Sequence, residues 1–161
     1  LLDLQPLTFT SMNLNPILLL CLRIIASFCG VFGFSIMFNS TIPMAAIAAL
    51  IGAVANTFRL ELIDFTGMPP AAAAFIGALS AGLLASEIKK NNGYPRISLT
   101  VPSIVIMVPG LYLYRAIYNF GIMSLTEAVS WFTSAIMIII MLPLGLIFAR
   151  ILTDRTFRFC T

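Results

Sequence analysis

The chain of 161 residues contains no histidine, only six acidic residues and only three cysteines. Histidine is the commonest metal ligand and general base in proteins, so its absence argues against a zinc site and against most acid–base chemistry. Cys21, Cys29 and Cys160 are scattered and form no C-x-x-C pair, which is typical of inert thiols rather than of a disulfide framework. We therefore expect neither a metal nor a cofactor.

Enzymatic motifs are missing as well. The sequence has no G-x-x-x-x-G-K-S/T phosphate loop, no H-E-x-x-H and no G-x-S-x-G. No pair of carboxylates lies inside an apolar segment. A membrane enzyme that acts on lipid would need such groups, so the sequence predicts that the protein is not an enzyme.

Charged residues are also scarce. They make up 9% of the chain, whereas a typical soluble domain carries about 25%. Hydrophobic residues account for 60% of the chain, and the mean hydropathy is +1.05. Such a composition is that of a protein whose solvent is the lipid bilayer.

What the chain does contain is a series of long apolar segments. Each has the length, about 17 to 25 residues, that crosses the hydrocarbon of a bilayer as a helix. Open strands would leave unpaired backbone groups in lipid, and the runs are too continuous for the alternation of a barrel. We predict an all-α integral membrane protein, a single transmembrane domain over residues 1–161, with five helices at about 16–38, 42–58, 70–86, 97–118 and 129–149.

The charged residues are distributed unevenly between the two sides of such a bundle. Asp3, Glu61, Asp64 and Glu127 fall on one side, where Arg59 is the basic residue near the loops. The positive-inside rule then places the N-terminus outside the cell and the C-terminus in the cytoplasm. No basic stripe interleaved with aromatic residues occurs, so the net charge of +3 does not indicate nucleic-acid binding. Six basic residues fall on the other side: Lys89, Lys90, Arg96, Arg150, Arg155 and Arg158.

The odd number of spans predicts a partner. Five helices enclose little protected volume by themselves, and a chain that begins outside and ends inside matches one half of a larger transporter. We therefore expect a companion membrane subunit, a homo-oligomer or both.

The fourth segment contains two prolines and a Pro-Gly step. Pro102 and Pro109 each remove an amide donor, and their spacing of seven places them on the same helix face. Pro109 frees the carbonyl of Val105 about 18 Å into the segment, and Gly110 adds backbone freedom. We predict a helix broken at both prolines that offers carbonyls to a cation and amides to an anion, as an amino acid zwitterion requires. The alternative is a plain proline kink with satisfied polar groups.

The same segment ends in Tyr112, Tyr114 and Arg115. Tyr112 and Arg115 are three residues apart, so they are neighbours on the helix surface. Arg115 is suited to hold a substrate carboxylate through two hydrogen bonds. The alternative is an aromatic belt at the membrane interface with a snorkelling arginine.

Arg23 and Arg59 are the other arginines at membrane level. Charge within the membrane is costly and usually paired, and the acids available on the same side are Glu61, Asp64 and Glu127. These residues predict either a structural ion-pair network or an outer vestibule that attracts anionic groups.

Two asparagines and several small residues are the remaining candidates for lining a path or for packing helices together. Asn39 and Asn56 are candidates to line a path, and for each the alternative is a helix cap or an interhelical hydrogen bond. The second and third segments carry small residues four positions apart, such as Ala48 and Gly52, which predicts closely packed helices.

The stretch VPSIVIMVPGLYLYRAIY resembles the threonine/serine exporter family. The likeness is to the C-terminal five-helix half, which in many bacteria is a separate small subunit. Upstream, GFSIMFNSTIPMAAIAALIGAVANTFR is similar to the first hairpin of the family, with a Phe-Asn turn, a small-residue helix and an arginine at its end. The residues that carry the resemblance in the first stretch are Pro102, Pro109, Gly110, Tyr114, Arg115 and Ala116.

This resemblance implies export of threonine and serine, driven by protons or by the membrane potential. It also implies a companion subunit with the other five helices. Some split members of the family are associated with export of small dicarboxylates such as succinate. Because no segment here contains an embedded acid or a histidine, we expect the energetic coupling to reside in the partner.

We therefore predict a subunit of a small amino acid exporter in the cell membrane. One alternative is a scaffold subunit whose partner makes all the substrate contacts, and another is an exporter of small dicarboxylates. The residues predicted to line the substrate path are Pro102, Pro109, Gly110, Tyr112, Tyr114, Arg115, Asn39, Asn56 and Arg59.

Overall fold

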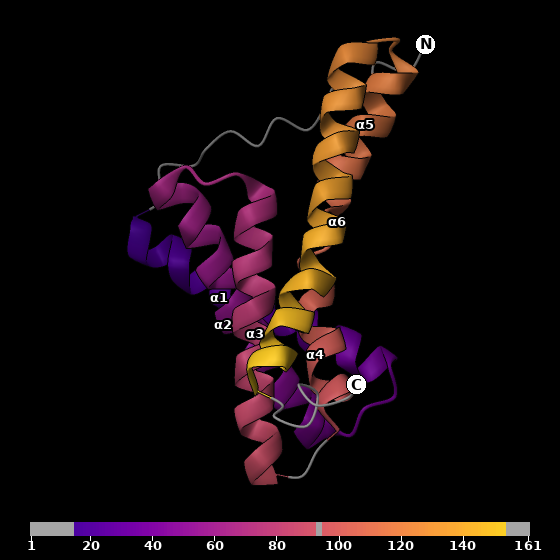
Figure 1. The fold of residues 1–161 in the computed structure, drawn as a ribbon. Coiled ribbons are helices and arrows are strands. Elements are labelled where there is room, and N and C mark those ends of the chain that lie inside the picture. The colour runs from indigo at the N-terminus through magenta and orange to yellow at the C-terminus, as the bar shows by residue number, and fades with distance from the viewer. Residues whose placement is uncertain (1–14, 93–94, 154–161) are drawn as a thin grey trace, which may run out of the picture.

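The computed structural model describes residues 15–92 and 95–153, and within these ranges the secondary structure is helical, with no strand (Figure 1). The helices are α1 (Pro16–Met37), α2 (Ile42–Thr66), α3 (Pro70–Asn92), α4 (Arg96–Val105), α5 (Gly110–Gly121) and α6 (Leu125–Thr153). α1, α2, α3 and α6 are each long and apolar enough to cross a membrane. The all-α membrane fold is thus confirmed. The predicted count of five is reached when α4 and α5, which meet at a 42° bend, are taken as one broken span.

Several helices extend beyond the apolar segments predicted from the sequence. α2 continues to Thr66, past the expected end at residue 58. It ends at Gly67, which adopts a left-handed conformation (φ 62°) and donates its amide to the Ile63 carbonyl at 3.0 Å. The polar residues that follow Phe58 continue the helix and bond outside it: Arg59 to the Met107 carbonyl, and Glu61 and Asp64 to Arg23 of α1. α3 and α6 also exceed their predicted bounds.

The break in the fourth segment lies at residues 106–109, where the second proline stands. α4 continues through Pro102, which corrects the expectation that both prolines interrupt the helix. Beside Pro102, the hydroxyl of Ser103 donates to the Leu99 carbonyl at 2.6 Å and to the Ala48 carbonyl at 2.9 Å. Packing and this extra hydrogen bond stabilise a turn that lacks one amide donor, as neighbouring helices do for prolines in other membrane helices.

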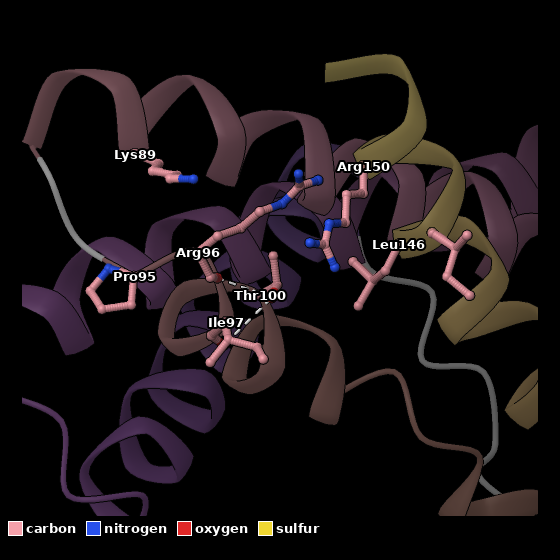
Figure 2. A pocket seen from close by; sticks show the side chains of 8 residues that line it. Lys89, Pro95, Arg96, Ile97, Thr100, Leu146 and Arg150 are labelled. Carbon is pink, nitrogen blue, oxygen red and sulfur yellow. Dashed lines mark hydrogen bonds between the residues drawn. The ribbon is translucent and has the colours of Figure 1, made fainter. Parts of the chain in front are cut away.

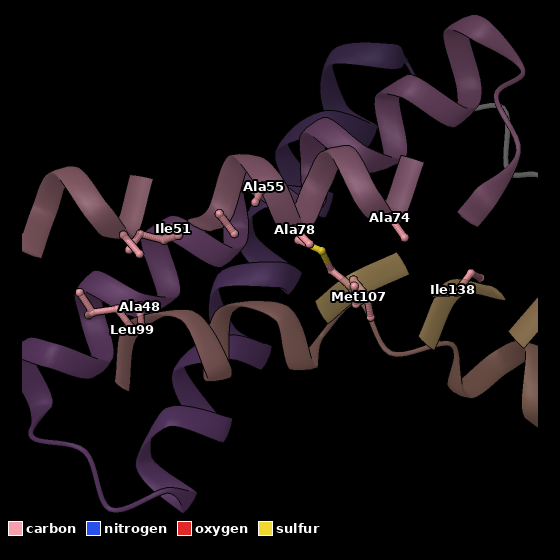
Figure 3. Packing of buried hydrophobic residues seen from close by; sticks show 11 residues of the cluster. Ala48, Ile51, Ala55, Ala74, Ala78, Leu99, Met107 and Ile138 are labelled. Atoms are coloured by element: carbon pink, nitrogen blue, oxygen red, sulfur yellow. The ribbon is translucent and has the colours of Figure 1, made fainter. Parts of the chain in front are cut away.

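The core is built largely from alanine, and Met107 from the break points into it (Figure 3). A Cβ on Gly145 of α6 would lie 2.5 Å from the carbonyl oxygen of Phe75 on α3. A Cβ on Gly82 of α3 would lie 2.6 Å from Ala149 Cβ on α6. The backbones of α3 and α6 therefore touch. The predicted close packing of small residues is confirmed, since the following are all buried: Ala48, Gly52, Ala73, Gly77, Ala78, Ala81 and Gly82.

The two halves of the broken span have different neighbours. α4 packs against α1, α2 and α3, whereas α5 packs mainly on α6. The hairpin of α5 and the first half of α6 stands apart from α1 and α2 at the top of Figure 1.

Only some of the charged residues that predicted the orientation lie within the described ranges. Lys89, Arg96 and Arg150 lie where α3 ends, α4 begins and α6 nears its end, around one common pocket. Which of the two sides faces the cytoplasm stays a prediction. The following lie outside the residues, or in one case the side chains, that the structure describes: Asp3, Lys90, Arg155, Arg158 and Cys160.

Candidate functional site

The break between α4 and α5 is a defined turn. Because Pro109 has no amide, the Val105 carbonyl instead accepts from the Val108 amide at 3.1 Å, so it is not free as the sequence had suggested. Pro109 has φ −79° and ψ 55°, the geometry of an inverse γ-turn, and the Gly110 amide donates across it to the Val108 carbonyl at 2.8 Å. The Leu113 amide then donates to the Pro109 carbonyl at 3.1 Å and begins α5.

Arg59 reaches the break from α2. Its Nη1 donates to the carbonyl oxygen of Met107 at 2.9 Å, and Met107 itself is fully buried. The Nε of Arg59 is buried and has no hydrogen-bond partner within the described part of the chain. Since a guanidinium carries five N–H donors, Arg59 caps one carbonyl of the broken main chain and retains donors beside it.

Gly77 of α3 makes the space for this arrangement. A Cβ at Gly77 would lie 3.1 Å from Arg59 Cβ and 3.4 Å from the sulfur of Met107. Tyr112, in the first turn of α5, is half-buried and packs against the core cluster that includes Met107. Helices α2, α3 and α5 thus converge on the break at Met107.

Arg23 has a different environment. Its Nη1 lies 2.8 Å from Glu61 Oε1 and its Nη2 lies 2.5 Å from Asp64 Oδ2, which joins α1 to the last turns of α2. This is the structural ion-pair network that the sequence offered as one alternative. Arg59 has no salt bridge within residues 15–92 and 95–153, so its charge is the one left to attract an anion at the break.

The tyrosines and Arg115 of α5 divide between two faces. Arg115 lies over the ring of Trp131 on α6, 4.6 Å from its centroid, and Tyr112 packs against the same ring with centroids 5.6 Å apart. Tyr114 is exposed on the other side of α5. The predicted proximity of Tyr112 and Arg115 is confirmed by their shared contact. Trp131 was missed, although it is the only tryptophan in the chain.

The two asparagines lie away from the break. Asn56, on α2, donates through its Nδ2 to the hydroxyl of Ser27 on α1 at 2.8 Å in a buried position, which is an interhelical hydrogen bond. Asn39 occupies the turn between α1 and α2 with a positive φ of 59° and is exposed. Pro102 faces this turn and lines a hollow of about 200 Å³ together with Phe38 and Ser40.

The structure therefore brings together only part of the residues predicted to line the substrate path. Arg59, Pro109, Gly110 and Tyr112 lie at or beside the break, whereas the other predicted residues have different neighbours: Arg115 contacts Trp131, Asn56 bonds to Ser27, Tyr114 is exposed, and Pro102 and Asn39 lie at or near the turn between α1 and α2. Met107 and Gly77 belong to the same arrangement and were not found from the sequence. A glycine four residues from another small residue signals helix packing, and nothing local indicates that it faces an arginine.

Comparison with known proteins supplies one match. A family model described as Threonine/Serine exporter, ThrE matches residues 23–152. No curated protein and no solved structure matches the chain. The family match confirms the resemblance found in the sequence, and together with the apolar helices it confirms a membrane protein of a transport family.

Proposed function

Because the chain belongs to the threonine/serine exporter family, we propose that it is one subunit of an exporter that carries threonine and serine out of the cell. The observation that supports this proposal most directly is the hydrogen bond from Arg59 to the Met107 carbonyl at the break. It sets a cationic side chain beside an irregular stretch of main chain. A discontinuous helix of this kind is a common substrate site in transporters.

An amino acid presents a carboxylate and an ammonium group, and the break offers a partner to each. The carboxylate would bind the guanidinium of Arg59 through two hydrogen bonds, near the positive end of α5. When Arg59 turns to the carboxylate, the Met107 carbonyl loses its donor and becomes available to the substrate ammonium. One rearrangement of Arg59 thus exposes both halves of the binding site.

In the structure, the protein's own side chains occupy the space at the break. Met107 and Pro109 are buried, and Arg59 occupies the space beside them. Substrate access therefore requires part of the surrounding structure to move. α5 is the candidate, because it is held mainly along α6 while α4 is packed on three other helices.

A companion subunit would cover surfaces that this chain leaves open. Large apolar side chains on α5, among them Leu111, Ile117 and Phe120, are exposed. A second five-helix subunit packed against α5 would enclose a path beside the break and bring the total to ten spans. We also propose that the ends carrying Lys89, Arg96 and Arg150 face the cytoplasm, in keeping with the positive-inside rule.

Reconstituted transport tests the proposal. Proteoliposomes containing the chain and its companion subunit are loaded with labelled serine, threonine or succinate, and efflux is followed under a proton gradient and under a membrane potential. We expect efflux of serine and threonine well above that from protein-free liposomes. Efflux of succinate alone would identify the dicarboxylate alternative, and efflux equal to that of protein-free liposomes under every gradient would refute transport by this pair.

The packed break favours one second candidate, a scaffold subunit. In that case the bond from Arg59 to Met107 only stabilises a broken helix, and the companion makes all contacts to substrate. A scaffold role predicts that changes at Arg59 lower the amount of folded complex without lowering the transport rate of each complex that remains.

A further inference from the structure

A basic pocket of about 390 Å³ lies at the opposite end of α4 from the break. Its three basic side chains come from three helices: Lys89 from α3, Arg96 from α4 and Arg150 from α6 (Figure 2). α3 and α4 follow one another in the chain, whereas Arg150 comes from α6, more than 50 residues after Arg96, and joins the cluster only because the bundle folds.

The charge of this pocket favours an anion. Among the described residues that line it, three are basic and none is acidic. Arg96 donates through Nη2 to the Gly82 carbonyl at 3.3 Å, which helps to hold its guanidinium at the pocket. Arg96 is also the first residue of α4, whose N-terminal end carries partial positive charge. Arginines at such a site match the geometry of a phosphate group.

The position and the apolar lining favour a lipid over a small ion. α3 and α6 end near the pocket and α4 begins at it, which places it at the depth of the lipid headgroups if these helices span the membrane. Ile97 and Ile147 line the same pocket and are exposed, by 72% and 47%. A phosphate would meet the basic residues while an acyl chain lies along the isoleucines.

We propose that this pocket binds the headgroup phosphate of an anionic phospholipid. Basic pockets between membrane helices are suited to such headgroups. The bound phosphate would bridge α3, α4 and α6, and so fix the start of the ten-residue helix that leads to the break. This site does not depend on the transported substrate.

Lipid titration of the purified full chain in a non-ionic detergent tests the proposal. The melting temperature is followed while short-chain phosphatidylglycerol, phosphatidylcholine or inorganic phosphate is added. We expect phosphatidylglycerol to stabilise the protein at concentrations at least tenfold lower than phosphatidylcholine. In the double variant Lys89→Gln/Arg150→Gln the half-effect concentration should rise about 25-fold, from a contribution near 1 kcal/mol per basic residue.

Two further variants serve as a control and as a substitute if the double variant does not fold. Arg115→Gln removes the same charge near Trp131, away from the pocket, and should leave the titration unchanged. If the double variant does not fold, the single change Lys89→Gln at an exposed residue should raise the half-effect concentration about fivefold. Equal effects of the two lipids, or a double variant that responds like the unchanged protein, would overturn the proposal. If inorganic phosphate stabilises the protein as strongly as phosphatidylglycerol does, the pocket binds a free anion and the proposal of a lipid ligand is overturned.

Discussion

α4 and α5 come from one apolar segment, yet the fold holds them in different ways. α4 buries Leu99, Thr100, Pro102 and Ser103 among α1, α2 and α3. α5 buries only Ala116 and packs mainly on α6. The break therefore separates an anchored half of the segment from a half that is supported along a single helix.

The difference follows from side-chain size. Ser103 of α4 lies so close to Gly52 of α2 that a Cβ on the glycine would come within 3.1 Å of the Ser103 backbone. Small residues allow this approach, which van der Waals contact and the Ser103 hydroxyl then stabilise. α5 instead presents bulky residues outward, including Tyr114, Ile117 and Phe120. We expect any movement that opens the break to involve α5 and α6 rather than α4.

The largest effect is expected at Arg59, which ties the break to α2. Arg59→Gln removes the guanidinium proposed to bind the substrate carboxylate and leaves the Met107 carbonyl without its donor. We expect transport per folded complex to fall at least tenfold, and the free energy of unfolding to fall by about 1–3 kcal/mol. Efflux from proteoliposomes, normalised to folded protein, measures the first effect.

Arg23→Gln is the matched control for Arg59, since it removes another arginine at membrane level that lies in a structural ion pair. It should lower stability and leave transport per folded complex unchanged. If Arg59→Gln behaves in the same way, the residue has only a structural role and the scaffold interpretation is correct.

A pair of glycine substitutions tests the anchoring of α4 directly. In Gly52→Ala the added Cβ would lie 2.6 Å from the Val31 side chain of α1 and 3.1 Å from the Ser103 backbone of α4, so both helices must give way. We expect a loss of about 1–3 kcal/mol in the free energy of unfolding. In Gly110→Ala, at the start of α5, the Cβ meets nothing within 4 Å, and the change should stay within about 0.5 kcal/mol. Equal losses, measured by unfolding in detergent, would show that both halves are equally fixed.

The features that the sequence predicted well are those set by local chemistry. Long apolar segments must become helices in lipid, because no other local structure satisfies their backbone. A proline followed by glycine removes a donor and adds freedom at one place, and Pro109–Gly110 closes the break and begins α5. These constraints act within a few residues, so one sequence is enough to read them.

The features that it missed depend on helices that are distant in sequence. Arg59 and Met107 are 48 residues apart, and their hydrogen bond requires a particular register of α2 against the broken span. Pro102 stays within α4 beside Ser103, whose hydroxyl bonds to the carbonyl of Ala48 on another helix, whereas Pro109 stands at the break. No local pattern specifies these alignments, which arise from the packing of small residues along α2 and α3.

A smaller effect is expected at Asn56, which joins the anchored part of the bundle to α1. Asn56→Ala removes the hydrogen bond to the Ser27 hydroxyl. Because such bonds between membrane helices are worth about 0.6 kcal/mol on average, the double-mutant cycle with Ser27→Ala should give a coupling near that value. A coupling of zero would mean that the packing of α1 on α2 does not need this bond.

The most local effect is expected at Trp131, which supports α5 from α6. Trp131→Phe weakens the contact with Arg115 and Tyr112. A cation–π pair of this kind contributes about 0.5–1 kcal/mol, so the α5 amides should exchange hydrogen about two- to fivefold faster. The α4 amides should keep their rates, because α4 does not depend on α6 for its packing. Equal acceleration in both helices would show that the break transmits strain and that the two halves open as one unit.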